Sequence, residues 1–114
     1  MSFVKIYHIA TEVDWGRRTD VYVPDGWRAE GFVHCSTDEQ VVRVANHLFA
    51  GRQDLVLLHI DPSGLTALVV WEDGEGSGED FPHVYGAIES AAVVATEPFA
   101  AGSDGTFDWW VPSD

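Results

Sequence analysis

Residues 31–48 read GFVHCSTDEQVVRVANHL, a strand pattern that runs directly into a helix pattern. Residues 31–35 predict a core strand, because strand-forming side chains dominate them. Ser36 and Glu39 have the S-x-x-E spacing of a capping box, so we expect the main helix to begin here and to be closed by Gly51. The apolar stripe expected on this helix consists of Val41, Val42, Val44, Ala45, Leu48 and Phe49.

The rest of the chain predicts short strands and one or two short helices. Thr11 is a candidate N-cap for a short helix through Trp15, and residues 20–28 read as an extended piece followed by a turn or one helical turn. The acidic, glycine-rich residues 72–80 (EDGEGSGED) predict a surface loop. The further strands are expected at residues 3–9, 54–60, 68–71, 83–85, 91–99 and 106–111.

These elements predict an α+β fold in a single domain of residues 1–114. Its sheet should be curved and mixed or mainly antiparallel, with one main helix and one or two short helices. The 114 residues are enough for one hydrophobic core.

The charge balance excludes several classes of partner. Six Lys and Arg face 19 Asp and Glu, a formal net charge of −13, so DNA, RNA and anionic membranes should be repelled. A small-molecule ligand is expected, and a basic protein partner or a homodimer remains an alternative. The single cysteine, the lack of a signal-peptide pattern and the lack of a membrane-length apolar run predict a cytoplasmic protein.

The histidine in the strand of residues 31–35 faces away from the cysteine beside it. Successive side chains of a strand alternate between its faces, so His34 and Ser36 should share the cleft side, while Val33 and Cys35 share the core side. Cys35 is therefore expected to be a buried, inert thiol rather than a nucleophile. Because this close His–Cys pair diverges, we expect no metal site.

Glu72 ends an apolar strand beside Trp71, where the chain turns. A carboxylate in this place suits general acid or base chemistry, and an exposed turn residue explains it equally well. Residues 81–85 then bring His83 and Tyr85 back toward it. Motifs of serine hydrolases, dinucleotide-binding folds and P-loops are absent from the sequence.

Four sequence blocks resemble a small bacterial family of unknown function, DUF952. They are IYHIATEVDW (6–15), EGFVHCSTDEQV (30–41), FAGRQDLVLLHID (49–61) and FPHVYGAI (81–88), together with the Trp-Glu pair at 71 and 72. The resemblance implies a fold of the ADP-ribosyltransferase-like superfamily, nearest to the RNA 2′-phosphotransferases. It implies NAD as a candidate substrate and no other cofactor.

The same resemblance implies roles for individual residues. His8 would contact the ribose on the nicotinamide side with Thr11 nearby, His34 and Ser36 would take the next positions, and Glu72 or His83 would lie near the reacting sugar. Family members often carry an arginine between the strand-end glutamate and the FPH block, and this chain has none there. The remaining candidates for contacts to an anion are Arg17, Arg18, Arg28 and Arg52.

The hypothesis is therefore a transferase or hydrolase acting on an ADP-ribosyl or nucleotide-like small molecule in a histidine-lined cleft. The alternatives are another biosynthetic enzyme that uses histidine acid–base chemistry, and a non-catalytic binding module with an exposed Trp109–Trp110 pair. The predicted catalytic residues are His8, His34, Glu72 and His83. The predicted substrate-binding residues are Thr11, Trp15, Ser36, Arg52, Trp71 and Tyr85.

Overall fold

A computed structural model of the chain describes residues 4–74 and 76–109 and shows an α+β fold. The helices are α1 (Glu12–Gly16), α2 (Trp27–Glu30) and α3 (Val41–Leu48), with 3₁₀ turns η1 (Pro62–Gly64) and η2 (Ser90–Ala92). The strands are β1 (Ile6–Thr11), β2 (Val21–Tyr22), β3 (Val33–His34), β4 (Leu55–Ile60), β5 (Leu68–Glu72), β6 (Phe81–Tyr85), β7 (Ile88–Glu89) and β8 (Val93–Phe99).

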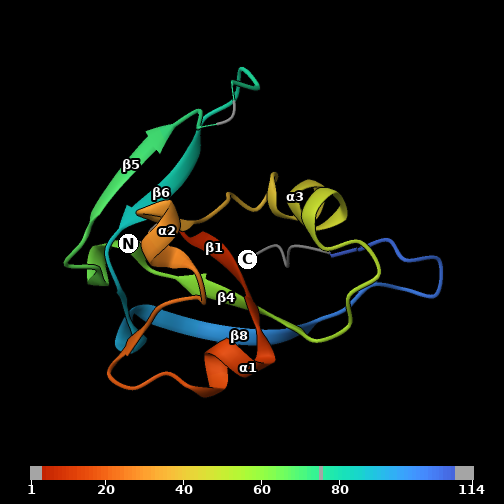
Figure 1. Cartoon of the computed structure of the whole chain (residues 1–114), viewed down its shortest axis with the longest axis horizontal. Coiled ribbons are helices and arrows are strands. Elements are labelled where there is room, and N and C mark those ends of the chain that lie inside the picture. Colours follow the sequence, from red (N-terminus) through yellow and green to blue (C-terminus); the bar gives the residue numbers. More distant parts are fainter. Residues whose placement is uncertain (1–3, 75, 110–114) are drawn as a thin grey trace.

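The described strands form two three-stranded sheets, β1-β4-β8 and β3-β6-β5, and a two-stranded sheet, β2-β7. All their pairings are antiparallel, which decides between the two sheet types expected from the sequence. An isolated bridge between Tyr7 and Ser36 connects the first three-stranded sheet to the second. In Figure 1 the β5–β6 hairpin and α3 stand on opposite sides of the view, and β1 runs between them.

The sheet β1-β4-β8 has a hydrophobic core on each face, which explains why β4 reads LVLLHI without polar alternation. One core faces the other sheets and buries residues such as Val33, Val84 and Ile88. The second core lies under α3 and buries Val41, Ala45 and Phe107. The main helix thus packs on one side of this sheet, and the strands β3 and β6, which carry His34 and His83, pack on the other.

The start of α3 differs from the expected capping box by one residue. Thr37 and Gln40, rather than Ser36 and Glu39, make the reciprocal bonds: Thr37 N–H donates to Gln40 Oε1 (3.0 Å), and Gln40 N–H donates to Thr37 Oγ1 (3.2 Å). The backbone of Ser36 forms the bridge to Tyr7 of β1 instead, and the cap is made one residue later. The helix ends at Leu48, and Gly51 takes a left-handed φ of 80° in the turn that follows.

Two strands expected from the sequence differ from the structure: one is shorter than expected, and the other does not form in the described residues. The strand expected at residues 31–35 is paired only at Val33–His34. Residues 106–109 form no strand, because Phe107 packs into the core under α3 rather than into a ladder, and residues 110–111 lie outside the described part of the chain. No helix in the described part of the chain is long and apolar enough to cross a membrane.

Candidate functional site

A cavity of about 570 Å³ opens beside β1, between the segment that carries α2, the helix α3 and the strand β6. It brings together five of the residues predicted from the sequence, namely His8, Thr11, His34, Ser36 and His83. Its other walls are Tyr7, Ile9, Asp14, Tyr22, Pro24, Asp25, Trp27, Glu30, Phe32, Val44, Leu48, Phe49, Asp73, Gly74 and Phe81.

The alternation predicted around His34 is confirmed. Val33 and Cys35 are fully buried in the core, while His34 and Ser36 line the cavity. Burial raises the pKa of the Cys35 thiol, so it stays protonated and faces away from the cavity. Across the ladder His34 pairs with His83, which puts two imidazoles on one face with ring centroids 5.4 Å apart.

His83 is held by a carboxylate from the neighbouring strand. Its Nδ1 lies 2.8 Å from Glu72 Oε2, and the Tyr85 hydroxyl donates to the same oxygen. The hydrogen bonds from Tyr85 and His83 lower the pKa of Glu72, so this carboxylate is ionised and Nδ1 of His83 is the donor. The Nε2 atom of a neutral His83 therefore carries the lone pair, which is the arrangement a general base needs.

Two neighbours fix the plane of the His83 ring. Phe32 stacks on it with centroids 4.0 Å apart and an interplanar angle of 14°. Gly74 approaches from the loop after β5, and a Cβ at that position would lie 3.2 Å from His83 Cε1. The ring is thus oriented by packing as well as by Glu72, and a side chain at position 74 would press on it.

His8 has a different role, because protein groups engage both of its ring nitrogens. Its Nδ1 lies 2.7 Å from the His34 carbonyl oxygen, and its Nε2 lies 2.8 Å from the Tyr22 hydroxyl. Nδ1–H donates to the carbonyl and Nε2 accepts from the phenol, since burial raises the pKa of Tyr22 and keeps its proton in place. Burial lowers the pKa of His8 to about 4, so the ring is neutral and ties β1 to β3 and β2.

Five other residues predicted for the site lie outside the cavity wall. Glu72 and Tyr85 act behind His83, and Trp71 is about half exposed on β5. Arg52 forms a bidentate ion pair with Asp54, away from the cavity. Trp15 packs against Tyr22, with centroids 5.6 Å apart.

Sequence reasoning missed Tyr22 and Phe32. Tyr22 is 1% exposed between two exposed valines, Val21 and Val23, so the V-Y-V alternation was the available signal. Phe32 directly precedes the strand that carries His34, and nothing in the sequence pairs it with His83.

The cavity wall is acidic. Asp14, Asp25, Glu30 and Asp73 contribute to it, and no lysine or arginine of the described residues does. A ligand in the cavity should therefore present an uncharged or cationic group to this wall. No group of three or more His, Cys, Asp or Glu among the residues the structure describes is arranged to hold a metal ion.

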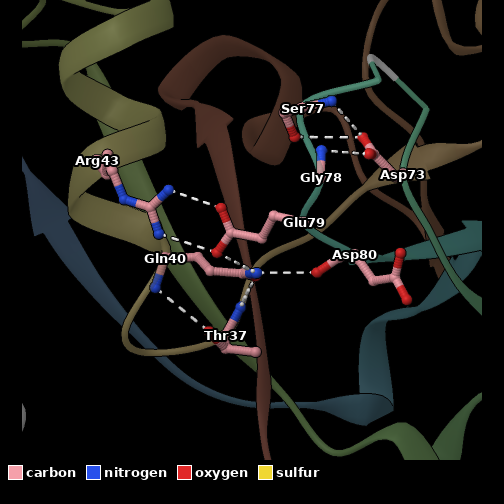
Figure 2. A network of polar contacts seen from close by, with 8 residues as sticks. All are labelled: Thr37, Gln40, Arg43, Asp73, Ser77, Gly78, Glu79 and Asp80. Atoms are coloured by element: carbon pink, nitrogen blue, oxygen red, sulfur yellow. Dashed lines mark hydrogen bonds and ion pairs between the residues drawn. The ribbon is translucent and has the colours of Figure 1, made fainter.

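The glycine-rich loop after β5 is fastened to the start of α3 (Figure 2). Glu79 accepts two hydrogen bonds from the Arg43 guanidinium, at 2.7 and 3.0 Å, and a third from Gln40 Nε2 at 3.0 Å. These contacts lower the pKa of Glu79 to about 2. Gln40 also donates to the Asp80 carbonyl. The part of the cavity wall formed by Asp73 and Gly74 is thereby connected to α3, which supplies Val44 and Leu48 to the same cavity.

Trp109 is half-buried rather than exposed as expected from the sequence, and Trp110, the other member of the expected pair, lies outside the described residues. The Trp109 ring packs edge-on against Tyr7 at 5.2 Å, and its indole N–H donates to Glu97. Glu97 also lies 2.6 Å from His59 Nε2. This cluster lies on the α3 side of the sheet and pins the end of the described chain there.

Solved structures of a protein from Caulobacter crescentus have a fold similar to that of this chain. The crystal structure of protein CC0527 from Caulobacter crescentus matches with a TM-score of 0.80 and 28% identity, over 91% of this chain and 93% of that one. Its solution NMR structure matches with a TM-score of 0.72 and 28% identity, over 90% of each chain. Both come from a structural-genomics programme, so they bring no specific activity to this chain.

None of the curated proteins compared with the chain matches it. The family profile described as a protein of unknown function (DUF952) matches residues 9–96, which hold the end of β1, the segment of α2, β3, α3 and the β5–β6 hairpin that surround the cavity. By this match over most of its length, the chain belongs to the DUF952 family.

Proposed function

We propose that the protein is an enzyme, a hydrolase or transferase acting on an ADP-ribosyl or nucleotide-like small molecule, with His83 as general base. The observation that carries the proposal is the hydrogen bond between Glu72 and His83, whose ring lies on the wall of the cavity. A carboxylate on Nδ1 fixes the tautomer and stabilises the imidazolium that forms when Nε2 takes a proton.

In this mechanism His83 removes a proton from a water molecule or from an acceptor hydroxyl. The oxygen of that water or hydroxyl bonds to the anomeric carbon of the ribose at the same time. The bond from that carbon to the leaving group breaks, and the leaving group departs with the electron pair. The carboxylates of Asp14, Glu30 and Asp73 line the same space and favour the positive charge that develops on the sugar.

The edge of β1 supplies a second argument for a ligand with an amide or nucleobase edge. Tyr7 exchanges both of its backbone hydrogen bonds with Ser36, at 2.8 Å each. Hydrogen bonding alternates along an antiparallel strand, so the N–H and C=O of Ile9 point to the same side as those of Tyr7. Ile9 lines the cavity, where a neighbouring donor and acceptor on a ligand would pair with these groups.

His8 and His34 have separate roles in the proposal. His34 lines the cavity and would contact the ribose. His8 is a positioning residue, because its ring bonds hold the His34 backbone and the Tyr22 hydroxyl in place. An ADP-ribosyltransferase-like ancestry of the fold is part of the same proposal and accounts for histidines on two adjacent strands.

The test is titration calorimetry with NAD and with ADP-ribose, followed by assays for release of nicotinamide or a nucleobase. His83→Gln should lower kcat by about 100-fold to 10,000-fold, the usual contribution of general-base catalysis. His47→Gln is the matched control, because His47 is an exposed residue of α3 outside the cavity wall. Absence of heat with either ligand at millimolar concentration would reject the proposed substrate class.

A second candidate function is acid–base catalysis on an uncharged or cationic biosynthetic intermediate. The observation that favours it is the cavity wall with four carboxylates and, in the described chain, no lysine or arginine. Binding of small cationic or uncharged compounds that depends on His83 but not His47, without any response to NAD or ADP-ribose, would support this candidate instead.

A further inference from the structure

A second groove, of about 590 Å³, adjoins the cavity. The two share four lining residues: Asp14, Pro24, Asp25 and Trp27. A ligand longer than one ring can therefore lie partly in the cavity and partly in this groove, passing Trp27 on the way.

The groove and the cavity differ in charge. Three of the six basic residues of the chain, Arg17, Arg18 and Arg28, line the groove, against two carboxylates, Asp14 and Asp25. The cavity has four carboxylates on its wall. In a chain with a net charge of −13, this concentration of arginine is local and adjoins the cavity that holds the candidate catalytic group.

The three arginines of the groove also differ from the other two arginines of the chain, Arg43 and Arg52, in their interaction partners. Arg43 and Arg52 are neutralised by bidentate contacts to Glu79 and Asp54. Within the described part of the chain, the three arginines of the groove have no carboxylate at ion-pair distance, although acidic residues outnumber basic ones three to one in the sequence. Their guanidinium groups are exposed and available to an anion from solution.

Arg18 is oriented before any ligand arrives. Its guanidinium carbon lies 4.1 Å from the centroid of the Trp15 ring, and Nη1 donates to the Trp15 carbonyl at 2.9 Å. The hydrogen bond uses one of five guanidinium N–H groups. Stacking holds the plane in place, so less side-chain entropy is lost when an anion binds.

We propose that the arginine groove is an anion subsite that receives the phosphate groups of a small-molecule ligand whose uncharged or cationic ring lies in the cavity. This inference rests on the proposed function and names the part of the substrate that sets its orientation. Arginine suits the role because its fork of N–H groups matches the spacing of phosphate oxygens.

The test uses inorganic pyrophosphate as probe, with binding followed by calorimetry and by Trp fluorescence. The double variant R17Q/R28Q should weaken pyrophosphate binding by about tenfold or more, the effect of losing charge-assisted hydrogen bonds. K5Q/R52Q is the matched control, because it removes the same charge from residues outside both the groove and the cavity. Equal weakening in both variants, or no saturable binding by the wild type, would overturn the proposal.

The outcome is separable from that of the proposed function. H83Q should retain pyrophosphate binding, because His83 is not among the residues of the groove. Saturable pyrophosphate binding that depends on Arg17 and Arg28, without turnover of any nucleotide-like compound, would keep the subsite and reject the enzyme. Turnover that is unchanged in R17Q/R28Q would keep the enzyme and reject the subsite.

Discussion

The imidazole Nδ1 of His83 lies 2.8 Å from the Oε2 atom of Glu72 in the β5–β6 hairpin, and Tyr85 donates to the same oxygen. The three side chains come from two adjacent strands, where Val70 rather than Glu72 is the direct partner of His83 in the register. The contact is therefore diagonal across the ladder, a separation that long side chains can span.

The first prediction concerns the proton on His83. When the ring of the wild-type protein is neutral, its ¹⁵N shifts should show a proton on Nδ1 and a lone pair on Nε2. Glu72→Gln should keep this tautomer, because the amide oxygen still accepts the hydrogen bond. Glu72→Ala should lose it, because the acceptor is gone. Tyr85→Phe is the control, since it leaves the Glu72–His83 bond intact, and an unchanged tautomer in Glu72→Ala would contradict the assigned geometry.

The second prediction concerns stability against pH and depends on His8. Burial lowers its pKa from 6.5 to about 4, so the unfolded chain binds a proton in this range that the folded protein does not. The part of the folding free energy that depends on a neutral His8 is fully present above pH 6.5 and is lost as the pH falls toward 4. It amounts to roughly 3 kcal/mol by the linkage relation.

The measurement is denaturant unfolding of wild type and His8→Gln between pH 4.5 and 6.5. Other titrating groups, such as Glu79, are present in both proteins, so their contribution cancels in the comparison. As the pH falls, the unfolding free energy of the variant should decrease less steeply than that of the wild type, whatever the stability of the variant at neutral pH. Parallel curves would show that His8 is not kept neutral by the fold.

The third prediction compares the two residues that hold the glycine-rich loop. Gln40 is 6% exposed and bonds Thr37 N–H, Glu79 and the Asp80 carbonyl, while the guanidinium of Arg43 is in solvent. Gln40→Ala should lower the free energy of unfolding by about 1–3 kcal/mol, because it removes a cap and leaves buried polar groups without partners. Arg43→Gln should have a much smaller effect that vanishes at high salt. Chemical denaturation checks both, and a larger loss from Arg43→Gln would contradict this ranking.

The fourth prediction concerns the thiol. Cys35 is fully buried, and burial raises its pKa, so it should not react with an aromatic disulfide reagent in the folded protein at pH 8. Labelling should proceed only through opening of the structure and reach its full rate in denaturant. Fast labelling of the native protein would place the cysteine on the cavity side and reverse the strand assignment.

Strand alternation and helical periodicity were enough to predict most of the fold and part of the site. They located β1, β4, β5 and α3, and they put His34 and Ser36 on the cavity side of β3, because burial of apolar side chains enforces both patterns. They misplaced the cap of α3, since Ser36 and Thr37 are equally good caps in sequence and the bridge to Tyr7 decides between them.

The rest of the site depends on packing between distant segments, which local patterns do not encode. The segment of Tyr22 crosses over His8, Phe32 stacks on His83, and Arg52 turns to Asp54, a partner two residues away. The catalytic role expected for His8 came from the family resemblance, which does not show that the His34 carbonyl and the Tyr22 hydroxyl engage both nitrogens of its ring.

The reciprocal hydrogen bonds between Tyr7 and Ser36 have a consequence for how the molecule responds to an occupant. They join the two three-stranded sheets, and both residues also line the cavity. A ligand bound in the cavity contacts both residues and therefore both sheets. Its binding free energy then adds to the free energy needed to separate the two sheets. Amide hydrogen exchange at Tyr7 and Ser36 should therefore slow in proportion to ligand saturation. The exchange rates of these two amides can be used to screen compounds for binding to the cavity.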